Sequence, residues 1–165
     1  MTERSTLSGP IRGMAAGVPY LALPPASGIC PAPLVLGMHA FEPPRSEAAL
    51  AGAIPMASLP AWRVHLGLPL FGARLPEGGV PVINRRGERD YLVELFGPVV
   101  EEAAAELRRV TKELRDTLPV TEAIALVGVG AGAAASLLPL AENPIEVDAA
   151  AVFNPVVDPA QVINA

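Results

Sequence analysis

The residues best suited to chemistry lie in a glycine-rich segment in the second half of the chain. Gly128, Gly130 and Gly132 alternate with small apolar residues, between an apolar run at 123–127 and a stretch rich in Ala and Leu. This order predicts a buried strand, a very tight turn and a close-packed helix, because only small residues let the two backbones approach each other there. The N-terminus of the helix would direct free N–H groups at the turn, which favours chemistry that stabilises an anion.

A nucleophile motif shares this spacing. Residues 128–132 read Gly-Val-Gly-Ala-Gly and match G-x-S-x-G at both outer glycines. Gly130, however, stands at the position of the nucleophilic serine. The segment therefore has the steric pattern of a hydrolytic turn without its reactive atom.

A dinucleotide motif fits the same residues. Gly128, Gly130 and Ala133 satisfy G-x-G-x-x-A. That motif normally follows the first strand of its unit and needs an acid at the end of the next strand. Here at least three predicted strands come earlier, and Glu146 and Asp148 stand at the start of the next strand. The nucleophile motif is favoured, while dinucleotide binding and a purely structural packing turn remain alternatives.

The elements that would position the turn follow from hydrophobic periodicity and from the prolines. Apolar runs predict strands at 18–23, 33–39, 62–70, 123–127 and 148–153. Ser46 is suited to cap a short helix. Apolar residues at alternating spacings of three and four predict a long helix over 88–116, with Pro98 starting or kinking a helix. A further helix would run to Leu140, where Asn143-Pro144 would break it, and 71–87 would be a loop.

Strands that alternate with helices predict an α/β fold, in which a mostly parallel sheet carries helices on both faces. Residues 1–14 are expected to form a flexible N-terminal segment, and residues 15–165 a single domain. The length of 165 residues suits one core, and 51% hydrophobic with 18% charged residues indicates a packed globular protein.

The composition also argues against several classes of protein. The net charge is −5 and no basic stripe occurs, which disfavours nucleic-acid binding. The apolar run 123–141 has the length of a membrane span, but its glycines and alanines and Pro139 favour a strand and helix instead. Cys30 is the single cysteine, so no intrachain disulfide forms, which fits a cytoplasmic protein.

A longer pattern carries a family resemblance. An apolar strand ends in Met38-His39-Ala40-Phe41 and is followed by a helix, a strand, a long helix and the glycine turn. This order, from about residue 15 to residue 160, resembles the N-terminal portion of the α/β-hydrolase family. Residues 43–47, 62–63 and 96–98 are similar to actinobacterial esterases and lipases of this type. His39-Ala40 stands where many lipases and esterases carry a His-Gly pair.

The resemblance implies hydrolysis of carboxylic esters or related acyl compounds as the parent activity, without a cofactor. It implies an oxyanion hole built from backbone N–H groups of Ala131 and of Ala40 or Phe41, with His39 beside the pocket. The ligand would be a small acyl compound or an anion. No metal site is expected, because His39, Glu42 and His65 are too few ligands in too scattered an arrangement.

The chain differs from the family at the residues that carry out hydrolysis. Gly130 has no side chain to attack a substrate, and the two histidines, His39 and His65, both precede the turn, whereas the triad acid and histidine of the family follow it. Asp158 stands where some members keep the acid, but an Asp before a proline is more often part of a turn. The chain is therefore expected to be inactive as written.

Three explanations of the missing serine stay open: an engineered inactive variant, a natural non-catalytic relative, or a fragment. The C-terminal strands of the family fold are not apparent, so an unpaired sheet edge is expected. Either a second copy of the chain or a C-terminal fragment would cover it. The alternative function is a non-catalytic protein that binds a small ligand or a dinucleotide through Gly128, Gly130 and Ala133.

Overall fold

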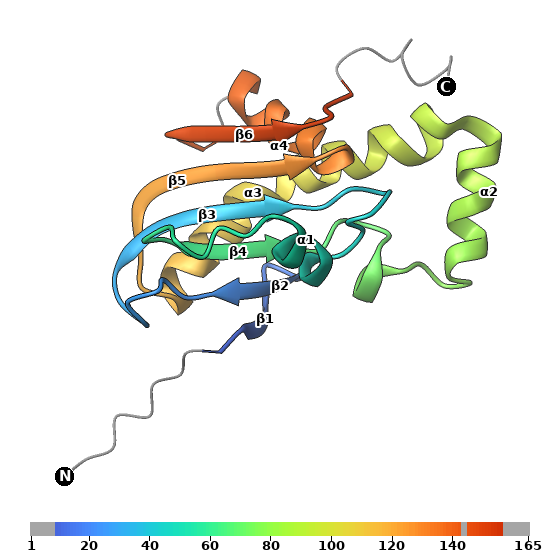
Figure 1. Ribbon diagram of the computed structural model, residues 1–165. Coiled ribbons are helices and arrows are strands. Elements are labelled where there is room, and N and C mark those ends of the chain that lie inside the picture. The colour runs from blue at the N-terminus through green and yellow to red at the C-terminus, as the bar shows by residue number, and fades with distance from the viewer. Residues whose placement is uncertain (1–8, 143–144, 157–165) are drawn as a thin grey trace.

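The computed structural model describes residues 9–142 and 145–156 (Figure 1). Within these residues one sheet has six strands in the order β1-β2-β4-β3-β5-β6. The strands are β1 (Ile11–Ala15), β2 (Val18–Leu23), β3 (Ala32–Met38), β4 (Trp62–Leu66), β5 (Val120–Val129) and β6 (Ala149–Phe153). Strands β3 to β6 pair in parallel, whereas β1 and β2 form an antiparallel hairpin that joins the sheet through β4. The predicted, mostly parallel sheet is confirmed.

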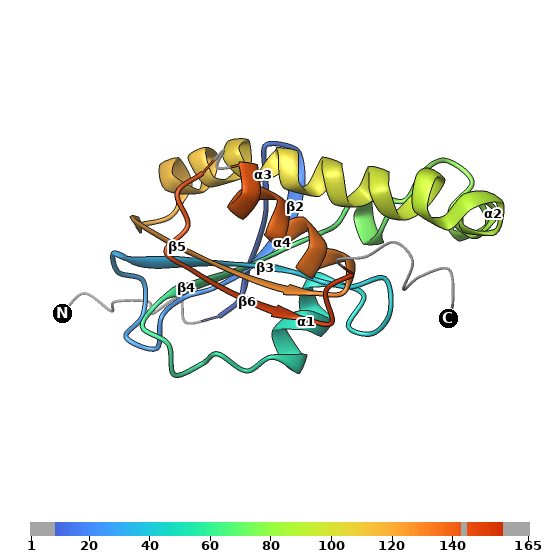
Figure 2. The same cartoon turned by 90° about the horizontal axis from the view of Figure 1, so that it is seen from above.

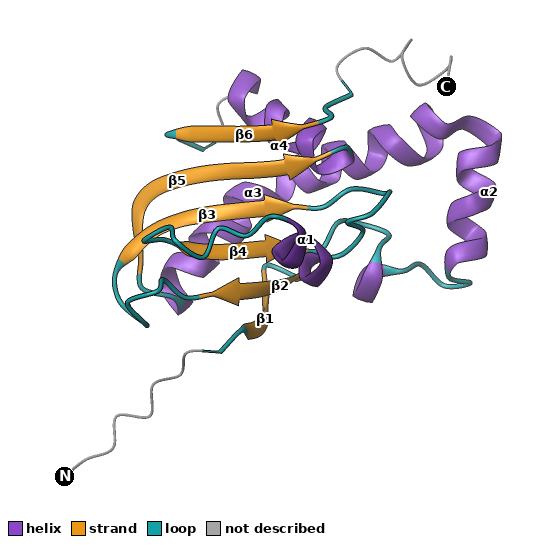
Figure 3. Ribbon diagram, in the orientation of Figure 1, coloured by secondary structure: helices purple, strands orange, loops and turns teal. Residues whose placement is uncertain are grey.

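Helices cover both faces of the sheet, as predicted. Helix α1 (Glu47–Ala53) packs against β3 and β4 on one face. Helices α3 (Gly97–Thr117) and α4 (Ala131–Glu142) lie on the other face (Figure 2). The remaining helical segments are the 3₁₀ turn η1 (Gly72–Arg74), α2 (Val80–Asp90) and the π-helical turn η2 (Tyr91–Phe96). Figure 3 shows these segments beyond the end of the sheet to which the parallel strands point.

The core lies between the sheet and α3. Leu34, Leu36, Trp62 and Leu126 are completely buried in the central strands, which explains why these strands read as continuous apolar runs. The buried stripe of α3 repeats every three or four residues, as the periodicity predicted: Val100, Ala103, Leu107, Val110 and Leu114. Burial of this stripe fixes α3 across the sheet.

Two local predictions about helix starts are confirmed. The Ser46 hydroxyl accepts a hydrogen bond of 3.1 Å from the Ala49 N–H and so caps α1. Pro98 stands in the first turn of α3, where its missing N–H costs nothing.

The region between β4 and α3 differs from the prediction. Strand β4 ends at Leu66 instead of residue 70. The Gly67 N–H still donates to the Pro19 carbonyl opposite it, but Pro19 has no N–H to return the bond, and Leu70 turns the chain with a positive φ of 67°. Residues 80–87 are helical rather than a loop, since Pro81 in the first turn starts a helix as readily as it ends one. The single helix expected from residue 88 is interrupted, because Asp90 has an extended φ of −161°.

The N-terminal prediction was also partly wrong. Residues 11–14, expected to be flexible, belong to β1 and pair with β2. A polar edge strand gives a weak sequence signal, because Arg12 and Met14 are exposed. The predicted helix break at Asn143 and the candidate acid Asp158 lie outside the described residues. None of the described helices is long and apolar enough to cross a membrane.

Candidate functional site

The glycine segment forms the predicted strand, turn and helix. Strand β5 ends at Val129, and α4 begins at Ala131. Gly130 alone makes the turn, with a φ of +56°. This left-handed conformation costs a residue with a side chain about 1–2 kcal/mol, and glycine adopts it freely.

The outer glycines allow the close approach that the sequence predicted. A Cβ on Gly128 would lie 2.6 Å from the Cα of Ala133, and a Cβ on Gly132 would collide with the carbonyl group of Met38. The helix therefore lies directly against its own strand and against the end of β3. Only glycine fits at these two positions.

Hydrogen bonds fix the turn to its neighbours. The Gly132 N–H donates to the His39 carbonyl at 3.1 Å, and the Gly130 N–H donates to the Phe153 carbonyl at 2.9 Å. The turn is thus held between the loop after β3 and the end of β6. A Cβ placed on Gly130 would lie 3.1 Å from the Cβ of Ala40, so this loop borders the position of the missing side chain.

The three backbone N–H donors implied by the resemblance differ in whether they already have a hydrogen-bond acceptor. The Ala40 N–H donates to the Pro44 carbonyl at 2.9 Å and is therefore occupied. For Phe41 and Ala131, no N–H partner occurs within the described residues. Ala131 is the first residue of α4, where N–H groups have no partner within the helix and the helix dipole is positive. Among the described residues, Phe41 and Ala131 therefore remain as donors without a partner, next to Ala40 and Gly130 along the chain.

His39 is buried and supports the loop. Its Nε2 accepts the Leu68 N–H at 3.1 Å, so Nδ1 carries the proton and donates it to the Ala40 carbonyl at 2.9 Å. Burial lowers the pKa of His39, and the ring is neutral at pH 7. With both nitrogens engaged, His39 holds the loops after β3 and β4 together.

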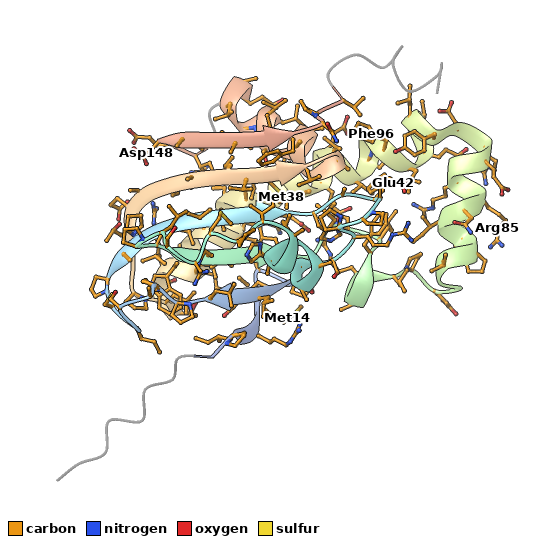
Figure 4. All side chains as sticks on the ribbon, in the orientation of Figure 1. Met14, Met38, Glu42, Arg85, Phe96 and Asp148 are labelled. Atoms are coloured by element: carbon orange, nitrogen blue, oxygen red, sulfur yellow. The ribbon has the colours of Figure 1, made fainter. Side chains whose placement is uncertain are left out.

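Four aromatic side chains meet beside the loop, and we call them the aromatic wall: Phe41, Phe71, Tyr91 and Phe96. Phe41 stacks on Phe71 with ring centroids 4.6 Å apart, and its edge contacts with Tyr91 and Phe96 are 6.2 and 6.0 Å. Figure 4 places the labelled Phe96 and Glu42 at the end of the sheet where β5 and β6 point. The sequence did not reveal this wall, because its members come from three segments separated by 20 residues or more along the chain.

Other chemically capable groups lie elsewhere. His65 stands in β4 opposite Gly37 and under Leu50 of α1, with its Nδ1 buried and unpartnered. Burial, with a smaller effect of Arg63, lowers the pKa of His65 to about 4. The described residues contain no group of three or more potential metal ligands. A hollow of about 690 Å³ is lined by residues including Arg115, Ile124 and Asp148, and Figure 4 shows Asp148 at the opposite end of the sheet from Phe96.

Comparisons with known proteins identify the fold. No family model matches the chain, and no curated protein matches it significantly. Among solved structures, TT1662 from Thermus thermophilus superimposes with a TM-score of 0.64 at 25% identity, over 94% of this chain and 65% of its own. The 2-hydroxy-6-oxo-6-phenylhexa-2,4-dienoate hydrolase from Rhodococcus sp. strain RHA1 has a TM-score of 0.61 at 19% identity, over 92% of this chain and 48% of its own. EstE1, a thermostable carboxylesterase cloned from a metagenomic library, has a TM-score of 0.55 at 17% identity, over 91% of this chain and 47% of its own.

Sheet order, the left-handed turn after β5 and these structural neighbours together define an α/β-hydrolase fold. The chain spans 65% of the length of TT1662 and about half of the other two. The names of these two proteins describe a dienoate hydrolase and a carboxylesterase, so the fold alone does not define the substrate.

Proposed function

We propose that this chain carries the turn and the anion-binding donors of an esterase-like site, and that it binds small acyl compounds or carboxylates without hydrolysing them. The observation that supports this most directly is Gly130 at φ +56°, which is followed by Ala131 at the start of α4 and bordered by Ala40 of the loop after β3. We infer that the Phe41 and Ala131 N–H groups converge on an oxygen placed at this turn, because two such donors stabilise a negative charge. Neither donor depends on the side chain at position 130.

Catalysis by this chain alone is not expected. Gly130 supplies no nucleophile, and Ser136, the nearest serine along the chain, is fully buried with its hydroxyl donating to the Gly132 carbonyl at 2.8 Å. Neither histidine is placed to act as the base, since both ring nitrogens of His39 are hydrogen-bonded between two loops and His65 lies between β3 and α1. A Ser-His-Asp mechanism needs a base within hydrogen-bond reach of the nucleophile.

The test is hydrolysis of a short-chain activated ester by the purified 165-residue chain. We expect no rate above the buffer blank. A rate well above the blank that a serine-directed inhibitor abolishes would contradict the proposal.

Dinucleotide binding remains the alternative function. Its motif residues lie in the turn, but the acids near β6 stand before that strand, whereas an acid that binds a ribose would follow it. Asp148 precedes β6 at the far end of the sheet, and its carboxylate accepts the Ile124 N–H at 2.9 Å. Saturable binding of a nicotinamide dinucleotide, with no response to acetate or phosphate, would favour this alternative.

We also propose that the β6 edge pairs with a further strand, from a second copy of this chain or from another polypeptide. Strand β6 is last in the sheet order, Ala149–Ala151 are exposed, and Phe153 is 48% exposed. An apolar edge strand with unpaired backbone groups favours such pairing. Light scattering should show a dimer that Ala150→Lys weakens, and a strictly monomeric chain at high concentration would rule out self-pairing.

Cytoplasmic location is the remaining proposal. It is supported by the single Cys30, which has no cysteine partner within the chain. Fractionation of the producing cells would test it directly.

A further inference from the structure

The hollow of about 690 Å³ lies at the end of the sheet opposite the glycine turn, where Figure 4 labels Asp148, one of its lining residues. One wall is the C-terminal half of α3, and the other is the start of β5 with the segment that precedes β6. The volume is within the range of small-molecule sites, roughly 300–1,000 Å³. The described residues that line the hollow include none of the glycine turn or of the aromatic wall, so it is separate from the site proposed above.

The α3 wall of this hollow is mainly cationic. Arg108, Thr111, Lys112 and Arg115 line it, and spacings of three and four residues place them on one face of the helix. Thr111 thus stands between two cationic side chains. Asp116 is the one carboxylate that α3 contributes to the hollow.

The opposite wall is anionic and partly apolar. Glu122, Glu146 and Asp148 supply carboxylates, and Ile124 and Ile145 add apolar surface. The two walls together carry three cationic and four anionic side chains, so a ligand with a net negative charge is not favoured. A ligand that carries one charge of each sign is complementary to both walls.

Part of this charge is already used within the protein. Arg115 Nη2 lies 3.1 Å from the Glu122 carboxylate and donates to the Glu122 carbonyl at 3.1 Å. The Asp148 carboxylate accepts the Ile124 N–H at 2.9 Å. Four further charged side chains of the hollow form no ion pair within residues 9–142 and 145–156: Arg108, Lys112, Asp116 and Glu146. Both walls therefore keep charges that a ligand can pair with.

Thr111 is an independent indication of a ligand. Its side chain is buried, with the residue only 2% exposed, and its Oγ1 has no hydrogen-bond partner in the part of the chain that the structure describes. Thr117 of the same helix, by contrast, donates its hydroxyl to the Glu113 carbonyl one turn earlier, at 3.0 Å. A buried hydroxyl without a partner is destabilising. An oxygen of a ligand bound in the hollow would supply the partner that α3 does not.

We propose that this hollow is a second ligand site and binds a small zwitterion with its amine and carboxylate at opposite ends, such as a dipeptide. The carboxylate binds to Arg108, Lys112 and the Thr111 hydroxyl. The ammonium group binds to Glu146 on the opposite wall. An extended dipeptide is on the order of 7 Å long, so its two charges can reach two different walls. This inference does not depend on the anion site at the glycine turn.

The experiment compares glycyl-leucine with two blocked forms, through backbone amide shifts of the 165-residue chain. N-acetyl-glycyl-leucine lacks the ammonium charge, and glycyl-leucinamide lacks the carboxylate. We expect glycyl-leucine to bind about tenfold more tightly than either form, because each has lost one charge-assisted contact. The largest shifts should occur near Thr111 and Ile124. Equal affinities of the three compounds, no saturable binding of glycyl-leucine, or shifts confined to Ala131 and its neighbours would each overturn the inference.

Two variants test the individual contacts. Thr111→Val keeps the shape of the side chain and removes the hydroxyl, so it should weaken glycyl-leucine binding about tenfold without loss of stability. Glu146→Gln should weaken glycyl-leucine by a similar factor and leave the affinity for the acetylated form unchanged. A hydroxyl with a purely structural role would leave the affinity of Thr111→Val unchanged, and that result would overturn the inference.

The matched control uses two adjacent arginines. Arg108 lines the hollow, whereas Arg109 is exposed on α3 outside it. Arg108→Gln should weaken glycyl-leucine about tenfold, and Arg109→Gln, which removes the same charge, should have no effect. Equal effects of the two variants would show that the dipeptide responds to the overall charge of the helix, and would contradict a site in the hollow.

Discussion

The backbone N–H of Gly132 donates a 3.1 Å hydrogen bond to the carbonyl oxygen of His39. This bond joins the first turn of α4 to the loop that follows β3, so the two segments that carry Ala131 and Phe41 are fixed to each other. The same His39 residue is held from its other side by the Leu68 N–H. The geometry of the site therefore depends on backbone contacts that only a glycine at position 132 permits.

Gly132→Ala should destabilise the protein by about 3 kcal/mol or more, because the new Cβ would collide with the carbonyl groups of Met38 and His39. Chemical denaturation measures the change in the free energy of unfolding. Gly52→Ala is the control, since Gly52 lies in α1 with open space around it. That variant should gain up to about 1 kcal/mol from higher helix propensity, and a loss at position 132 no larger than experimental error would contradict the steric explanation.

Gly130→Ser should fold but should not create an esterase. The serine must adopt a left-handed conformation and approach Ala40, which costs about 1–3 kcal/mol. Without a histidine at the turn, its hydroxyl is not activated. Thermal unfolding checks the first expectation and ester hydrolysis the second, and a turnover rate well above that of the unaltered chain would show that another group acts as base.

Much of this architecture was readable from local sequence. The turn was predictable because the glycines at 128, 130 and 132 are needed for close approach of neighbouring backbone. The hydrogen bond from the Ala40 N–H to the Pro44 carbonyl was not predictable, because a backbone bond of this kind leaves no pattern in the side-chain types. The aromatic wall was not predictable either, because Phe71 and Phe96 contact Phe41 only through tertiary packing. Pro81 misled the prediction because proline both ends strands and starts helices.

The ion pair of Arg74 with Glu106 should anchor the segment that carries Phe71. Arg74 Nη1 donates to Glu106 at 2.9 Å and to the Gly67 carbonyl at 3.1 Å, and the Arg74 and Glu106 side chains are 15% and 10% exposed. Glu106→Gln should cost about 2–3 kcal/mol, because it removes the main partner of a nearly buried guanidinium.

The control for this pair is Arg45→Ala. Arg45 faces Glu42 at 3.7 Å, with 63% and 86% of the two side chains exposed, so its loss should cost at most about 0.5 kcal/mol. Urea denaturation of both variants makes the comparison. Equal costs would show that burial does not strengthen the Arg74 pair.

Stability should fall as the pH falls from about 7 to about 5, in part through His65. The pKa of His65 is about 4 in the folded protein and about 6.5 when unfolded, so the unfolded chain binds a proton in this range that the folded chain excludes. This linkage corresponds to about 2 kcal/mol between pH 7 and pH 5. His65→Gln should remove most of that slope, and His39, whose pKa is also lowered, should retain a smaller share. An identical pH dependence in the variant would contradict the burial of a neutral His65.

The central claim is that the turn still binds anions although its nucleophile position holds glycine. The most direct measurement is the backbone amide spectrum of the unaltered chain during titration with acetate at pH 7. We expect the Ala131 and Phe41 N–H signals to shift together in a saturable manner, while the Ala40 N–H, bonded to Pro44, moves much less. Shifts spread evenly over the surface, or a dinucleotide that moves the turn signals while acetate leaves them unchanged, would contradict the claim.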